Sequence, residues 1–165
     1  MQLKRSTRSR LLAGLVVLIL PLAAGAAPLV PGTSFPPLSL EDQHGKTVST
    51  RADTRIVLFA ADKAANDLIN EVLAAQPAGV LGTLNAVYFA DISAMPALVT
   101  RMFALPALRE MPFAVGLGRD ATQLADLPRQ KGAATILRLA DGKVIAIEYA
   151  HNTGQLKQAI GLKCT

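Results

Sequence analysis

A chain of 165 residues is long enough for one domain with a substantial hydrophobic core. Its formal net charge of +5 comes from one end, because four of the 17 basic residues precede residue 11 and all 12 acidic residues follow residue 40. The other 13 basic residues nearly balance the acidic ones and are scattered along the chain. This pattern argues against a nucleic-acid-binding surface on the domain.

The first 26 residues have the three parts of a secretory signal. Residues 1–10 are basic, residues 11–20 are continuously apolar, and Pro21 precedes a run of small residues that fits a cleavage site after Ala26. The apolar segment is about half of the ~20 residues that a membrane-spanning helix needs. We therefore expect export to the periplasm, a mature chain that begins at Ala27, and membrane contact only through the signal before cleavage.

An extended lead-in is predicted over residues 27–37, where Pro, Gly and Ser are frequent. The domain itself is expected to span residues 38–165. Two short segments, 38–40 and 47–50, flank a turn-rich loop in which Gly45 can adopt a positive φ. They predict a β-hairpin at the edge of the domain.

The stretch from Arg55 to Leu73 predicts the central unit of the fold. Residues 56–61 form an uninterrupted apolar run of strand length, β-branched at its start. From Asp62, which can cap a helix, apolar residues recur at helical spacing. A buried strand that leads directly into a helix opens a βαβ unit, so both faces of the sheet should be covered.

A second strand and an apolar helical stretch are predicted next. A loop at 76–82 leads to a buried strand at 86–90. Pro96 suits the first turn of a helix, and Pro106 ends that helix or opens a second short one. Apolar residues dominate this stretch and its surroundings: Met95, Leu98, Val99, Met102, Phe103, Leu105, Leu108, Met111 and Phe113.

The last third of the chain predicts a strand, a hairpin and a closing helix. Residues 111–117 indicate a strand, and a polar connection follows at 122–132. Two further apolar segments, at 135–139 and 143–149, flank Asp141-Gly142, a strong hairpin signal. Asn152 or Thr153 can then cap a helix.

In this order the elements predict an α/β domain, with a mixed β-sheet flanked by α-helices and an N-terminal β-hairpin. Three segments, 35–46, 57–60 and 134–144, give the chain a resemblance to the thioredoxin-like fold superfamily in its peroxiredoxin and TlpA-type form. The resemblance covers about residues 30–163. The chain is similar in particular to the YtfJ-type periplasmic proteins, which are small, exported and without the redox cysteines.

The resemblance implies where a thiol site would lie, and this sequence departs from the family there. Redox members place a thiolate at the start of the helix after the central strand, where the helix dipole lowers its pKa. The equivalent positions are Ala64 and Asp67. Such members also place a cis-proline before the last hairpin, at a position that falls on Ala133 or Ala134, and a cis bond without proline would cost ~3 kcal/mol. We expect no thiol–disulfide oxidoreductase activity.

Other chemistry has little support in the sequence. Cys164 is the sole cysteine; it could permit a disulfide-linked dimer, but a thiol on a chain end is more often incidental. His44 and His151 have no carboxylate at a ligand spacing. Gly116-Leu-Gly118 lacks the third glycine of a dinucleotide fingerprint. We therefore expect no metal and no cofactor.

An interaction module remains, with an unidentified periplasmic protein or peptide as its partner. Proteins with the resembled fold usually contact clients through the loop at the start of the first helix and the loop before the final hairpin. Here these loops are 62–67 and 130–134, bordered by the apolar stretch 95–108. The Met-rich stretch 95–112 could adapt to a partner, although most of its large apolar side chains, with Phe113, are expected to cover the sheet. Free N–H groups at the helix start would suit a carboxylate or an extended peptide. The candidate partner-binding residues are Asp62, Lys63, Ala64, Asp67, Ala133 and Ala134.

Two alternatives stay open. The simplest role of the charged residues at the helix start is a cap with a solvated face. The chain as a whole could instead be an atypical periplasmic oxidoreductase, related to thioredoxins or peroxiredoxins or a flavin-dependent dehydrogenase, with an unrecognised site. A flavin or haem band in the absorbance spectrum would indicate the enzyme.

Overall fold

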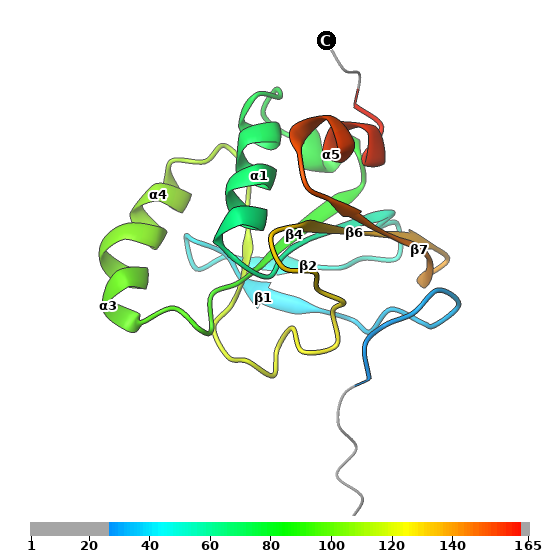
Figure 1. Ribbon diagram of the computed structural model, residues 1–165, viewed down its shortest axis with the longest axis horizontal. Coiled ribbons are helices and arrows are strands. Elements are labelled where there is room, and N and C mark those ends of the chain that lie inside the picture. Colours follow the sequence, from blue (N-terminus) through cyan, green and yellow to red (C-terminus); the bar gives the residue numbers. More distant parts are fainter. Residues whose placement is uncertain (1–26, 163–165) are drawn as a thin grey trace, which may run out of the picture.

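The computed structural model describes residues 27–162 (Figure 1). The predicted secretory signal and Cys164 lie outside these residues, so export, cleavage and a disulfide-linked dimer stay predictions. Within the described part of the chain, no helix is both long enough and apolar enough to cross a membrane.

Five strands form the central sheet in the order β5-β4-β3-β6-β7. They are β3 (Ile56–Ala60), β4 (Ala86–Asp91), β5 (Gly116–Gly118), β6 (Ala134–Ala140) and β7 (Lys143–Ala150). The strands β3, β4 and β5 are parallel to one another, whereas β6 is antiparallel to both β3 and β7. The predicted mixed sheet is confirmed, including the final hairpin, whose turn places Asp141 and Gly142 at positive φ.

The N-terminal hairpin and the helices complete the fold. A separate antiparallel pair joins β1 (Ser39–Glu41) to β2 (Thr47–Ser49), as predicted. The helices are α1 (Lys63–Ala74), α2 (Val80–Thr83), α3 (Ala97–Val99), the π-helix η1 (Thr100–Ala104), α4 (Leu105–Arg109) and α5 (Thr153–Ala159). The short helix α2 occupies part of the segment that was predicted to be a loop at 76–82.

The two faces of the sheet are covered by different kinds of structure (Figure 1). Alternate residues of β3 point to opposite sides, so Leu58 packs in the core cluster beneath α1 and α5, while Phe59 packs in a second cluster. The second cluster includes Leu40 of the hairpin, Phe35 of the lead-in and Leu124 of the connection before β6. Helices therefore cover one face, and the hairpin with two irregular segments covers the other.

The prediction of a strand over 111–117 is wrong for most of its length. The side chain of Gln43, from the β1–β2 loop, donates to the carbonyl of Phe113 (2.7 Å) and accepts from the N–H of Val115 (2.9 Å). These backbone groups are then not available for strand pairing, so only Gly116–Gly118 forms β5. A buried side chain from far away in the sequence thus shortens the edge strand.

Candidate functional site

The start of α1 and the loop before β6 lie side by side, as predicted. Asp62 is the N-cap of α1, and its Oδ1 accepts the N–H of Ala65 (2.9 Å). Its other oxygen, Oδ2, accepts the N–H of Gly132 (2.7 Å), which lies 70 residues further along the chain. One carboxylate therefore caps the helix and also fixes the pre-hairpin loop.

The environment of Asp62 keeps this carboxylate charged. Its partial burial alone would raise the pKa of Asp62, but the backbone N–H groups of Ala65, Gly132 and Ala64 and the charge of Lys131 together lower it. The expectation of free N–H groups for an external carboxylate needs correction, because the protein's own carboxylate already binds there. An anionic ligand would have to displace Asp62.

The neighbouring candidates on the first turn of α1 are solvent-exposed. Lys63 and Asp67 form an ion pair of 2.5 Å one turn apart, and the Lys63 side chain is 82% exposed. Exposed pairs of this kind contribute little to stability. Ala64 is exposed beside them. These three residues are therefore available for contact with a partner.

Ala133 and Ala134 are not available, which corrects their assignment as contact residues. Both side chains are fully buried, and Ala134 already belongs to β6, where it pairs with Ala150. Ala134 begins the strand one residue earlier than predicted and packs in the core. Ala133, directly before the strand, is also fully buried, so neither side chain has a surface to offer. The peptide bonds of residues 27–162 are all trans.

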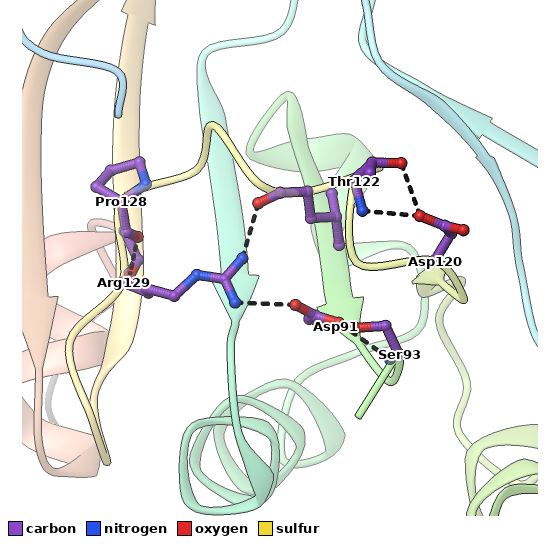
Figure 2. A network of polar contacts seen from close by, with 8 residues as sticks. Asp91, Ser93, Asp120, Thr122, Pro128 and Arg129 are labelled. Atoms are coloured by element: carbon purple, nitrogen blue, oxygen red, sulfur yellow. Dashed lines mark hydrogen bonds and ion pairs between the residues drawn. The ribbon is translucent and has the colours of Figure 1, made fainter. Parts of the chain in front are cut away.

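Arg129 joins the ends of two strands to the connection before β6, as Figure 2 shows. Its Nη1 donates to Asp91 Oδ2 (3.0 Å) at the end of β4, its Nη2 donates to the Leu124 carbonyl (2.8 Å), and its guanidinium lies 5.3 Å from the centroid of the Phe59 ring. Ser93 donates its hydroxyl to the other oxygen of Asp91 (2.6 Å). The Asp91 side chain is only 8% exposed. A substitution that removes the Arg129 guanidinium would therefore leave a nearly buried carboxylate without its cation.

A groove separates α1 from the helical arm formed by α3, η1 and α4, and its cavity measures about 600 Å³. Figure 1 shows the arm standing to one side of α1. One wall is the outer face of α1, and the other is the arm with its flanking residues. The lining of the arm side is apolar: Ile92, Met95, Val99, Phe103, Ala104, Ala107, Leu108 and Met111.

Several large apolar side chains of the arm point into solvent. Phe103 is 67% exposed and Leu98 is 68% exposed, and Met102 and Val99 are exposed as well. The expectation for residues 95–113 holds for most of the side chains it named: Leu108 and Phe113 are buried in the core, and Met95, Leu105 and Met111 pack against it. Met102 and Phe103 are the exceptions. The π-helical turn η1 lies at the centre of the arm, a conformation that often marks a functional segment.

The polar groups at the base of the α1 wall are partly satisfied. Tyr88 is fully buried and donates its hydroxyl to Asn66 Oδ1 (2.7 Å). Its burial, helped by the negative charge of Asp67, raises the pKa of Tyr88 well above its usual range, so it stays a neutral donor. One turn further along, the Oδ1 atom of Asn70 is buried and has no hydrogen-bond partner among the described residues.

The two glycines considered for a dinucleotide site have packing roles, and the two histidines considered as metal ligands lie on different loops. A Cβ atom on Gly116 would come within 2.5 Å of the Phe89 ring, and one on Gly118 within 2.4 Å of Leu124, so packing accounts for both glycines. His44 and His151 are exposed on different loops. Among residues 27–162, no three His, Cys, Asp or Glu side chains are grouped so that they could hold a metal ion.

Sequence reasoning identified part of this site and missed the rest. Asp62 and the neighbourhood of the two loops were predicted from the strand–helix pattern and the resemblance. Arg129 and Asn70 were missed. Asp91 could have been noticed as an acid directly after a buried strand, but its partner lies 38 residues away, and no local pattern joins the two.

Comparison with solved structures identifies the fold. No protein-family model matches the chain, and no curated protein sequence matches it significantly. A candidate protein disulfide isomerase from Bacteroides thetaiotaomicron is similar with a TM-score of 0.55 and 11% identity, over 81% of this chain and 87% of that chain. Peroxidoxin BcpB from Mycobacterium tuberculosis gives a TM-score of 0.51 and 14% identity, over 81% and 95% of the two chains.

A third similar structure is the exposed lipoprotein thioredoxin Etrx1 from Streptococcus pneumoniae, with a TM-score of 0.52 and 13% identity, over 76% of this chain and 98% of that chain. The chain thus has a thioredoxin-like α/β fold. At these low identities the likeness concerns the fold alone, and the particular resemblance to the YtfJ-type proteins stays a prediction.

Proposed function

We propose that this chain is an exported thioredoxin-like protein that acts in the periplasm without thiol redox chemistry, as a module that binds another protein. The observation that carries the proposal is the exposed apolar surface of the arm beside the groove, formed by Leu98, Val99, Met102 and Phe103. Contiguous exposed apolar side chains with polar neighbours are typical of interaction sites. Met and Phe side chains adapt to, and anchor, a partner surface.

The proposed site lies next to the loops through which the fold usually meets its clients. The groove is lined by Asp62, Lys63 and Asp67 from the start of α1 as well as by the arm. This chain has lost the thiol positions but keeps a recess and an apolar platform there. Binding therefore takes the place of redox chemistry in our proposal.

The binding test uses the mature protein as bait in periplasmic extract. Phe103→Ser should remove most of the captured partner, because a large side chain at the centre of the apolar surface is lost, while the melting temperature should stay unchanged for an exposed position. Ile145→Ser is the matched control, since Ile145 is 58% exposed on β7, away from the arm. Loss of the partner with the Ile145 variant and not with the Phe103 variant would misplace the site.

The absence of redox chemistry is tested by insulin reduction. A two-thiol reaction needs a second cysteine, and Cys164 is the only one in the chain. The protein should therefore give only background turbidity, and Cys164→Ser should leave the result unchanged. Turnover well above that of the cysteine-free variant would contradict the proposal.

Export is tested by the mass of the mature protein. The basic, apolar and small-residue succession that ends at Ala26 predicts a periplasmic species that begins near Ala27. Intact-mass measurement of the periplasmic fraction should find this species. A full-length protein confined to the cytoplasm would show that the N-terminus is not a cleaved signal.

A further inference from the structure

The groove has two chemically different walls. The residues of the α1 wall recur every three or four positions and so share one helix face, and most of them are polar: Lys63, Asn66, Asp67, Asn70, Glu71 and Ala74. On the opposite wall, Met95, Val99, Phe103 and Ala107 are four residues apart and present an apolar face. A segment that fills the groove must therefore be apolar on one side and polar on the other.

The charge of the groove is negative. Four carboxylates line it, from Asp62, Asp67, Glu71 and Asp91. Lys63 pairs with Asp67, and Arg129, which is not part of the lining, pairs with Asp91, so the carboxylates that no ion pair neutralises are Asp62 and Glu71. Two basic side chains of the arm are not part of the groove lining. Arg101 lines a separate recess, and Arg109 donates to the carbonyl of Gln43. A groove lined by one sign of charge favours a ligand of the opposite sign.

Two polar groups on the α1 wall, the Glu71 carboxylate and the Asn70 amide oxygen, differ from the other polar groups that line the groove. Asp62 is bound by backbone N–H groups, Asp67 by Lys63 and Asp91 by Arg129. No ion pair within the described part of the chain includes Glu71. The buried Oδ1 of Asn70, one residue before Glu71, also lacks a donor among residues 27–162. Such an acceptor is costly unless a ligand supplies an N–H group.

From these observations we infer that the groove selects a peptide segment with a large apolar side chain facing the arm and a Lys or Arg facing α1. The apolar side chain packs against Phe103 and Met95, and the cation lies between Glu71 and Asp67. The inference rests on the proposed function and specifies the chemistry of the partner. Only the peptide's charge pattern is new, so it can be tested separately from the proposal that the module binds at all.

The test measures fluorescence anisotropy of three labelled nine-residue peptides on the mature protein. One alternates Leu or Phe with Lys, the second replaces each Lys by Glu, and the third replaces each apolar residue by Ser. The first peptide should bind at least about tenfold more tightly than either of the others, and its binding should weaken in high salt. Glu71→Lys should weaken it about fivefold or more.

Controls separate charge selection from loss of structure. Glu110→Lys makes the same charge change on an exposed residue outside the groove and should leave binding unchanged. Thermal melting should be equal for both charge variants, because both positions are on the helical surface. Phe103→Ser should weaken the first peptide strongly.

Three other results would contradict, respectively, the charge selection, the binding of a linear segment and the proposed function. Equal binding of the Lys and Glu peptides, or an equal effect of Glu71→Lys and Glu110→Lys, would overturn the charge selection and leave the binding module standing. If no peptide binds while Phe103 still governs capture of a partner from extract, the groove does not take a linear segment, and the inference is overturned. If Phe103→Ser changes neither measurement, the proposed function itself fails.

Discussion

Replacing Gln43 by alanine should lower the free energy of unfolding by about 2–4 kcal/mol, because it leaves several buried backbone groups without partners. The Gln43 side chain is buried and donates to the carbonyls of Leu108 (3.2 Å) and Phe113 (2.7 Å). Its own Oε1 accepts the N–H of Val115 (2.9 Å).

The same substitution should also weaken partner binding. Gln43 ties the β1–β2 loop to the end of α4 and to the segment before β5, and the Arg109 side chain donates back to the Gln43 carbonyl (3.0 Å). These contacts position the arm that forms one wall of the groove. Loosening them makes the apolar surface less well ordered, so binding has to supply the ordering entropy.

Urea unfolding followed by circular dichroism measures the first effect. His44→Ala is the matched control, since His44 is the next residue in the same loop but is exposed, and its side chain should contribute within about 0.5 kcal/mol. A loss below about 1 kcal/mol for Gln43→Ala would show that these hydrogen bonds do not determine how the arm is held.

Replacing Asp62 by alanine should cost about 2–3 kcal/mol at neutral pH. The carboxylate caps α1 through the N–H of Ala65, which is typically worth about 1 kcal/mol, and it accepts a second, charge-assisted bond from Gly132. Asp62→Asn should cost less than Asp62→Ala, because asparagine can still cap the helix. Its amide cannot accept from Ala65 and Gly132 at the same time, so the pre-hairpin loop loses its anchor.

The cost of Asp62→Ala should depend on pH in a definite direction. The pKa of Asp62 is lower in the folded protein than in the unfolded chain, so its contribution is complete above the ordinary pKa of aspartate. The contribution is lost as the pH falls through the lowered pKa of the folded state. The difference in unfolding free energy between wild type and Asp62→Ala should therefore be smaller at about pH 3 than at pH 7, and an unchanged difference would contradict the assigned role.

Most of the backbone architecture follows from local sequence patterns. The alternation of apolar runs and turn residues predicts the hairpins and the order of the elements. The helix cap predicted at Asp62 is confirmed, and of the two caps predicted for the last helix, Asn152 or Thr153, the structure has Asn152. These features depend on residues close together in the chain. For that reason one sequence, read without its fold, was sufficient to identify a thioredoxin-like α/β domain.

The strand predicted over 111–117 shows where local patterns stop being informative. Its residues have the hydrophobicity of a strand, yet Gln43, about 70 residues earlier in the chain, takes up the backbone groups that pairing would need. The burial of Ala134 has the same origin, because the register of β6 against its neighbouring strands decides which residues face the core.

The candidate site itself was decided by tertiary structure. The apolar spacing of residues 95–108 predicts a helix with an apolar face, but a pattern cannot say whether that face meets the sheet or solvent. In the folded chain a groove separates the arm from α1. Phe103 and Leu98 of the arm are exposed, and Glu71 and Asn70 of α1 line the opposite wall of the groove. Composition and periodicity determine which elements form; the packing of segments distant in sequence determines which of their side chains remain free to bind.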